Sequence, residues 1–379
     1  MSSANFGIGL TGGGARGAYQ AGVLQALSEI LKSQNLDGKN NPFRYWSGVS
    51  AGSINATHMA ANATDAVKGA EALVKLWSRL EPDKVYRTDF LTLSSNSLKW
   101  IRDLSFGEFF KAKMAESLLD TEPLWDLLRK NMDLPSIQRQ IESGGLNGLA
   151  CSTYSYKDNR TVTFCQGKNK YHWNRHRRYS KNEDIKIEHI VASCSIPLLF
   201  PSVKINDEYF ADGSFRNLSP ISPLLHMGAQ KILMISVRGR EEFSERVYNM
   251  EPKLARISGI ILNALFFDTL EIDLERVRHI NEIVAALKKD VETKRSDYTM
   301  IDYMVIRPSQ DVGKIACEQI KKLPRFVRYL LAGLGSAEES AELLSYILFT
   351  SGFTKKLIDL GYEDTMSQKK ELTRWLCPN

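Results

Sequence analysis

The pentapeptide Gly48-Val49-Ser50-Ala51-Gly52 lies where a run of aromatic and β-branched residues, 43–49, meets an alanine-rich stretch, 54–70. The run predicts a strand and the stretch predicts a helix. A G-x-S-x-G pattern at such a junction is typical of a nucleophile, because small residues permit a tight turn that exposes the serine hydroxyl at the positive end of the helix. Chance alone produces the pattern in about one in ten chains of this length. Its place between a strand and a helix therefore favours Ser50 as a nucleophile, with Gly48 and Gly52 supporting the turn.

A second glycine-rich turn precedes this junction. The apolar run 6–10 predicts a strand that stops at Gly12-Gly13-Gly14, and apolar residues over 18–31 then recur at helical spacing. Gly12, Gly14 and Gly17 also fit the G-x-G-x-x-G fingerprint of dinucleotide binding, with Asp37 about 20 residues further on. That acid should end a second strand, whereas residues 28–36 are typical of a helix end running into a loop. The fingerprint therefore fails on its context.

We interpret the turn instead as an oxyanion hole. The backbone N–H groups of Gly12, Gly13 and Gly14 would face the charge that develops on an attacked carbonyl oxygen. Glycine suits this role because a side chain would obstruct the substrate. Arg16 belongs to the same turn, and for its side chain we favour an exposed or ion-paired position that steadies the loop over direct catalysis. Gly17 would support the turn.

The alternation of strand and helix patterns predicts an α/β fold with a doubly wound, mainly parallel sheet. Further strand-like runs cover residues 148–154, 161–164, 203–210 and 231–237. Beyond residue 240 helical patterns dominate, over 254–289 and 337–349, with one strand candidate at 303–306. We expect a catalytic domain of residues 5–240 and a mainly helical C-terminal extension of residues 241–379, packed on or over it.

Composition limits the class of protein. The chain has 379 residues, of which 43% are hydrophobic and 25% charged, which excludes a disordered or collagen-like chain. Its five cysteines form no C-x-x-C pair, so no disulfide framework or zinc knuckle is indicated and a reduced, intracellular chain is expected. No H-E-x-x-H or EF-hand pattern occurs, so we expect neither a metal nor a cofactor.

Membrane-spanning and targeting signals are not expected either. The first ten residues lack the basic and apolar regions of a secretory signal. The longest apolar stretch, residues 257–267, is too short to cross a bilayer as a helix. We therefore expect a cytoplasmic protein or one peripheral to a membrane. The stretch 257–267 is best interpreted as core, with a lid or acyl-chain platform as the alternative.

A serine nucleophile needs a base, and the best candidate is an aspartate. The sequence Phe210-Ala211-Asp212-Gly213-Ser214 places Asp212 between a strand-like run and a turn formed by Gly213, from where a carboxylate could project into a cleft. An ordinary Asp-Gly turn without a catalytic role would have the same sequence pattern. Among the six histidines, His226 offers a rival base, because it completes the chain order Ser…Asp…His of some triads.

The motifs together resemble the patatin-like phospholipase family. The glycine-rich turn at 12–17, G-x-S-x-G at 48–52 and Asp-Gly at 212–213 follow in the family's order over roughly residues 5–240. Between them, residues 192–201 are similar to its A-S-x-x-I-P…F-P segment, and Asn217 and Pro220 match a trailing N-x-x-P. Ser214 departs from the family's usual glycine or alanine after Asp-Gly, which bears on the geometry of that turn.

The resemblance implies a fold, a mechanism and a substrate class. The fold would be three-layered, with a mainly parallel sheet between helices. The mechanism would use a dyad without histidine, in which Ser50 attacks and Asp212 is the base, and no metal or cofactor takes part. Burial could raise the pKa of the aspartate enough for that role. The substrate would be an acyl ester of a phospholipid or lysophospholipid. A lipid-responsive binding or regulatory protein with a vestigial dyad is the alternative.

The charge distribution favours an anionic lipid surface as a partner. The net charge of +6 divides into +8 for residues 1–240 and −2 for residues 241–379. Six Lys or Arg residues lie in 168–181 among Tyr171, Trp173 and Tyr179, a composition suited to anionic headgroups. A solvated loop is the alternative, and nothing else in the chain supports nucleic-acid binding. Residues 321–328 form a second basic cluster of the same kind, and no feature indicates an oligomeric state.

Overall fold

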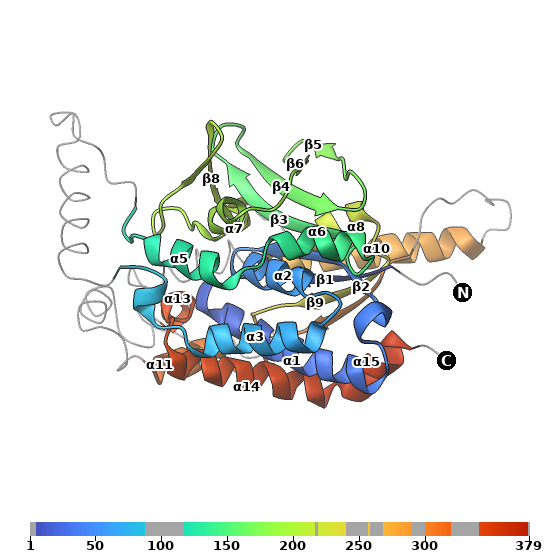
Figure 1. The fold of residues 1–379 in the computed structure, drawn as a ribbon. Coiled ribbons are helices and arrows are strands. Elements are labelled where there is room, and N and C mark those ends of the chain that lie inside the picture. The colour runs from blue at the N-terminus through green and yellow to red at the C-terminus, as the bar shows by residue number, and fades with distance from the viewer. Residues whose placement is uncertain are drawn as a thin grey trace.

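The fold is α/β, with a mostly parallel central sheet between helices, as the sequence predicts (Figure 1). The computed structural model describes residues 5–87, 117–216, 219–239, 257, 268–289, 300–319 and 341–377. Strands run in the order β10-β9-β1-β2-β3-β4-β6-β5, and the β7–β8 hairpin joins through β8 to β3. From β10 to β3 all neighbours are parallel, whereas β4 and β8 run antiparallel to β3.

The strands span short stretches of the chain: β1 Phe6–Leu10, β2 Phe43–Val49, β3 Gly148–Ser155, β4 Arg160–Gly167, β5 Asn174–Arg175, β6 Arg178–Asn182, β7 Val203–Ile205, β8 Glu208–Asp212, β9 Lys231–Ile235 and β10 Asp302–Ile306. The helices are α1 Gly17–Ser33, α2 Ala51–Ala61, α3 Ala66–Ser78, α5 Glu122–Asn131, α6 Pro135–Glu142, α7 Ile187–Cys194, α8 Ile221–Met227, α10 Asp268–Lys289, α11 Val312–Cys317, α13 Ala341–Ile347, α14 Ser351–Ser367 and α15 Lys369–Leu376.

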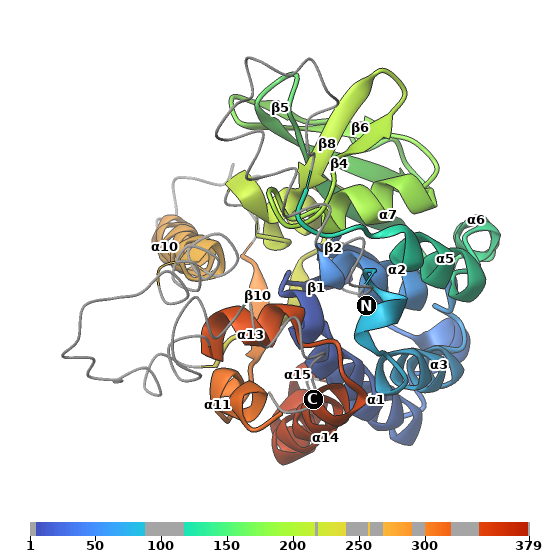
Figure 2. The same ribbon diagram turned by 90° about the vertical axis from the view of Figure 1, so that its left-hand side faces the viewer.

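Two apolar cores cover the two faces of the sheet. Alternation along β9 shows the division, because Leu233 and Ile235 belong to one core while Ile232 and Met234 belong to the other. Helices α1, α2, α3, α7 and α14 pack on the first face, and α8 and α10 on the second. Figure 2 shows α10 on one side of strands β10 and β1, and α2 and α3 on the other.

The described residues beyond 240 share this sheet and both of its cores, since α10 belongs to the second core and α11, α13, α14 and α15 to the first. Strand β10, which the sequence places at 303–306, pairs in parallel with β9. Helix α14 runs alongside α1 (Figure 1), and Gly22 and Gly361 permit the close approach, because a Cβ atom on either would overlap the backbone of the other helix. The division into a domain of residues 5–240 and an extension of residues 241–379 stays a prediction.

Two predicted elements are each divided in the structure. The helix expected over 54–70 is two helices, because the chain leaves α2 at Asn62 and Asp65 caps α3 by accepting a hydrogen bond from Lys68 N–H (3.3 Å). The strand expected over 203–210 is a hairpin, in which Asn206 takes a positive φ of 54° between β7 and β8. Asparagine tolerates this conformation better than most residues, which explains the turn.

Part of the C-terminal prediction lies outside the described residues. The basic cluster 321–328 lies outside them, and so does the apolar stretch 257–267 except for Ile257. Within the predicted helical range 254–289 the structure describes α10. No helix in the described ranges is both long and apolar enough to cross a membrane.

Candidate active site

Ser50 occupies a sharp turn between the end of β2 and the start of α2, as the sequence predicts. Its φ and ψ are 54° and −132°, an unfavourable combination for a residue with a side chain. Gly48 and Gly52 make the turn possible: a Cβ atom on Gly48 would overlap the carbonyl oxygen of Gly52, and one on Gly52 would overlap that of Leu10. Both glycines are therefore required by close backbone approach.

Hydrogen bonds hold the backbone of this turn in place. The Ser50 N–H donates to Ser193 Oγ (2.9 Å), and Ser193 Oγ donates in turn to the carbonyl oxygen of Ser152 in β3 (2.7 Å). On the other side, the N–H and the hydroxyl of Ser53 both donate to the carbonyl oxygen of Ser50, at 2.8 and 2.6 Å. Strain at Ser50 is thus offset by contacts with α7, β3 and its own helix.

The sheet register brings Asp212 toward Ser50. Val49, the residue before Ser50, pairs with Ser152 of β3, and the next residue, Thr153, pairs with Asp212 at the end of β8. The Asp212 N–H donates to the carbonyl oxygen of Ser195 (2.9 Å). Gly213 must be small, because a Cβ atom there would overlap the carbonyl oxygen of Ser152. Strands β2 and β8, which both pair with β3, thus place the two residues close together.

The Asp212 carboxyl is buried and only half satisfied. Its side chain accepts a hydrogen bond at Oδ1 from Ser214 N–H (2.8 Å), whereas Oδ2 accepts none of ordinary geometry from the described residues. Burial raises the pKa of Asp212 to about 6, and the nearby Ser50 hydroxyl and Ser214 act in the opposite direction. Ser214, which departs from the family's pattern, contacts the Asp212 carboxyl through its backbone N–H.

The glycine-rich turn lies beside the same site. Gly13 and Gly14 have positive φ values of 155° and 55°, and a Cβ atom on Gly13 would lie 2.5 Å from Val237. Within the part of the chain that the structure describes, the N–H groups of residues 12–14 donate no hydrogen bond. Gly14 and Ser50 line one pocket. The turn therefore has donors available next to the serine.

Arg16 is buried, whereas an exposed side chain was one of its two expected positions. It is 3% exposed, donates from Nε and Nη2 to Ser345 Oγ at 2.8 and 2.5 Å, and stacks its guanidinium over the Tyr346 ring, 4.4 Å from the centroid. Both partners come from α13, far along the chain, which local sequence could not reveal. Gly17 supports the turn by letting α1 approach α2, since a Cβ atom there would lie 2.8 Å from that of Ala51.

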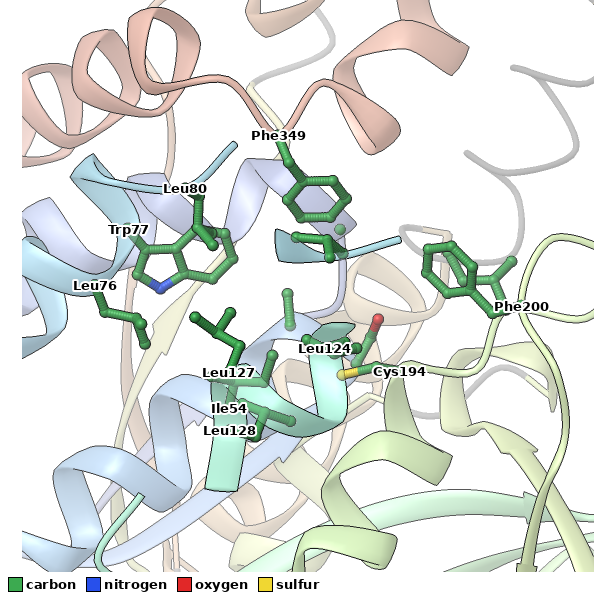
Figure 3. A pocket seen from close by; sticks show the side chains of 15 residues that line it. Ile54, Leu76, Trp77, Leu80, Leu124, Leu127, Leu128, Cys194, Phe200 and Phe349 are labelled. Atoms are coloured by element: carbon green, nitrogen blue, oxygen red, sulfur yellow. The ribbon is translucent and has the colours of Figure 1, made fainter. Parts of the chain in front are cut away.

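A narrow apolar pocket leads away from Ser50 (Figure 3). The space between its walls is about 520 Å³, counting the part open to solvent, and among the described lining residues Ser50 supplies the hydroxyl in an otherwise largely apolar wall. Sequence reasoning missed its walls, because they come from several elements and no motif marks them. The lining residues other than Gly14 and Ser50 are Ala51, Ile54, Leu76, Trp77, Leu80, Val85, Leu124, Leu127, Leu128, Cys194, Ile196, Phe200 and Phe349.

None of the six histidines, all of which the structure describes, lines this pocket. The rival base His226 stacks on Trp173 with ring centroids 4.8 Å apart, and Trp173 belongs to the core on the opposite face of the sheet. The buried His58 bonds instead to Gly69 O (3.0 Å), and His189 stacks on Phe164. The structure therefore does not bring His226 to Ser50, and a triad with it is wrong.

The segment 168–181 is not the loop of exposed aromatic anchors that its composition suggests. Tyr171 and Trp173 are buried, and Tyr179 donates a hydrogen bond to Asp158 (2.6 Å). Tyr171 and Trp173 thus pack in the core on the second face of the sheet, whereas Tyr179 packs against the first core. The exposed part of the segment carries its cations, among them Lys168, Lys170, Arg175 and Arg177.

Asp37 precedes a short 3₁₀ helix, Gly38–Asn40, and does not end a strand, so the dinucleotide fingerprint has no acid in the required place. No group of three or more metal-ligating side chains lies together in the described ranges.

The family model for patatin-like phospholipases matches residues 10–225. The chain therefore belongs to the patatin-like phospholipase family. Among solved structures, VipD from Legionella pneumophila is 11% identical, with a TM-score of 0.38 over 97% of this chain and 67% of its own. Human GIVD cytosolic phospholipase A2 is 11% identical, with a TM-score of 0.45 over 99% of this chain and 60% of its own. No curated protein matches the sequence.

Proposed function

We propose that this chain cleaves fatty-acyl ester bonds of phospholipids or lysophospholipids with a Ser50–Asp212 dyad. The observation that carries the proposal is the convergence of three features: a strained serine in a sharp turn, a buried aspartate beside it with one unsatisfied oxygen, and an apolar pocket that begins at the serine. A pocket lined this way suits a fatty-acyl chain, because burial of each methylene group contributes about 0.8 kcal/mol.

The first half of the reaction forms an acyl-enzyme. The Asp212 carboxylate accepts the proton of the Ser50 hydroxyl while Oγ attacks the ester carbonyl carbon. The oxyanion of the tetrahedral intermediate faces the N–H groups of Gly12, Gly13 and Gly14. Collapse of the intermediate breaks the ester bond, and the leaving alcohol takes the proton from Asp212.

The second half releases the fatty acid. Water attacks the acyl carbonyl, Asp212 accepts its proton, and collapse returns the proton to Ser50 Oγ. A pKa of about 6 supports Asp212 in both steps, since the carboxyl is mostly ionised at neutral pH yet more basic than an ordinary aspartate. Gly17, Gly48, Gly52 and Gly213 support the turns, and the described residues require neither a metal nor a cofactor for these steps.

The location of this activity is part of the proposal. Residues 5–240 would form the catalytic domain and residues 241–379 an extension packed on it. The exposed cations Lys168, Lys170, Arg175 and Arg177 would contact an anionic membrane surface, so that the protein acts as a peripheral membrane protein.

The test is covalent labelling of the serine combined with turnover. The wild-type chain should react with a fluorophosphonate at Ser50 and hydrolyse lysophospholipid in mixed micelles. Ser50→Ala should abolish both, and Asp212→Asn should slow both by at least about 100-fold. His226→Ala is the matched control and should retain full turnover. Absence of labelling in a folded wild-type chain would favour the alternative, a lipid-responsive binding protein with a vestigial dyad.

A further inference from the structure

The glycine-rich turn is packed against a helix that lies outside the region shared with the family. The family model covers residues 10–225, whereas α13 spans Ala341–Ile347. This helix contacts the short 3₁₀ helix Gly14–Arg16. A part of the chain that no family motif marks therefore borders the proposed oxyanion hole.

Arg16 makes the polar part of this contact. The guanidinium donates two hydrogen bonds to Ser345 Oγ, at 2.8 and 2.5 Å, and lies over the ring of Tyr346. Ser345 is fully buried and Arg16 is 3% exposed, so the bonds are shielded from water. Hydrogen bonds from a charged group are the stronger ones, and shielding increases their strength further.

The backbone of Tyr346 makes the steric part of the contact between α13 and the glycine-rich turn. Its carbonyl oxygen occupies the space that a Cβ atom on Gly14 would need, so the helix lies directly against the turn. Arg16 closes the same turn through its own backbone, because its N–H donates to the carbonyl oxygen of Gly13 (3.1 Å). The position of Arg16 thus influences the direction of the neighbouring N–H groups.

The residues that follow Tyr346 continue into the acyl pocket. Phe349 lines the apolar pocket. Tyr86 contacts this segment twice: its hydroxyl donates to the carbonyl oxygen of Ile347 (3.2 Å), and its ring makes an edge contact with the ring of Phe349 at a centroid distance of 6.3 Å. Figure 3 shows Phe349 reaching the pocket from the C-terminal part of the chain. Residues 345–349 therefore contact the turn and the pocket at once.

We propose that Ser345 is a positioning residue for the hydrolysis reaction: it holds Arg16, and through Arg16 the glycine-rich turn, in the geometry that stabilises the oxyanion. The inference rests on the proposed function. Ser345 does not touch the substrate, and its effect passes through the orientation of the N–H groups of residues 12–14. Loss of its hydroxyl should weaken transition-state binding more than ground-state binding.

The experiment compares Ser345→Ala with Ser28→Ala. Ser28 is also buried, but its hydroxyl bonds only within α1, to the carbonyl oxygen of Gln25 (2.7 Å), so its loss removes a hydroxyl without touching the turn. With a p-nitrophenyl ester of a medium-chain fatty acid, Ser345→Ala should lower kcat roughly tenfold to 100-fold and leave KM within about twofold. Ser28→Ala should leave both constants near wild type.

Fluorophosphonate titration separates positioning from folding. Ser345→Ala should react more slowly and still reach the wild-type stoichiometry. A lower stoichiometry with an unchanged kcat for each labelled site means only that less protein is folded, and it overturns the proposal. An unchanged kcat and labelling rate overturn it as well. If the wild-type chain itself is neither labelled nor active, the proposed function fails first.

A double-mutant cycle tests the route through Arg16. Arg16→Met removes the hydrogen bonds to Ser345 and keeps a long side chain. If Ser345 acts through Arg16, Ser345→Ala should lower kcat in the wild-type background and have no further effect in Arg16→Met. Equal losses in both backgrounds would show that Ser345 acts on the site by another route and would overturn the proposal.

Discussion

The carbonyl oxygen of Tyr346 occupies the space that a Cβ atom on Gly14 would need, and thereby joins the glycine-rich turn to a helix near the other end of the chain. Gly14→Ala would incur both this overlap and the strain of φ +55°. We expect at least about a 100-fold loss of esterase activity. The control is Gly38→Ala, since Gly38 has nearly the same φ of 57° and a Cβ atom there would make only an ordinary contact with the Thr64 carbonyl oxygen at 3.9 Å. Equal activity of the two variants would contradict the role of the contact.

The second prediction concerns the pH dependence of the reaction. Asp212 must be ionised to accept a proton, and burial raises its pKa to about 6. The value of kcat/KM should therefore fall about tenfold for each pH unit below that pKa and level off above it. A pH–rate profile of the wild-type chain checks this. A profile that stays flat down to the ordinary pKa of an aspartate would remove Asp212 as the base.

The same burial should make Asp212 costly for stability. A carboxyl whose pKa is higher in the folded state than in the unfolded state destabilises the fold as pH rises from 3.8 to about 6. Above that range the full cost, about 3 kcal/mol, applies.

Asp212→Asn removes the charge and should raise the free energy of unfolding at about pH 8 by up to about 3 kcal/mol. Near pH 4 the difference should disappear, because the wild-type carboxyl is then neutral. Urea unfolding at both pH values measures the effect. A variant that is less stable than wild type at the higher pH would contradict it.

Leu127 should limit the length of the acyl chain. Together with Leu76 and Leu80 it lines both the apolar pocket and a neighbouring surface groove that carries charged side chains, so it separates the two. Leu127→Ala should open the pocket and raise the preference for longer acyl esters several-fold, measured as ratios of kcat/KM. The control is Leu225→Ala, a partly buried leucine packed on the other face of the sheet. If Leu127→Ala changed kcat/KM by the same factor for esters of every chain length, Leu127 would not limit the length of the acyl chain.

Binding to an anionic membrane should depend on the cations of residues 168–181 and not on their aromatic neighbours. Each exposed Lys or Arg contributes about 1 kcal/mol near such a surface. The double variant Lys168→Glu, Arg177→Glu should therefore bind phosphatidylserine-containing vesicles at least about 2 kcal/mol more weakly in cosedimentation. The control variant is Lys369→Glu, an exposed residue of α15. Equal vesicle binding by the wild-type chain, the double variant and Lys369→Glu would exclude residues 168–181 as the membrane-binding surface.

Local sequence was sufficient for most individual elements. Strand β2 and the turns at Ser50 and Asp212 follow from residues within a few positions of one another. Errors arose where a turn was not recognised: Asp65 and Asn206 each divide a predicted element, because a single capping or positive-φ residue outweighs the surrounding pattern. The burial of Tyr171 and Trp173 was also missed, since a mixed basic and aromatic segment does not reveal which face of a sheet will cover it.

The sequence by itself determined the α/β class, the family, the turn that strains Ser50 and the glycines that permit it, because these depend on short-range backbone preferences. Only the tertiary structure decided which residues meet. The β2–β3–β8 register carries Asp212 to Ser50, burial raises its pKa, and α13 brings Ser345 and Tyr346 to the glycine-rich turn. Pairing, desolvation and packing of this kind join residues that are far apart in the chain, so no local pattern encodes them.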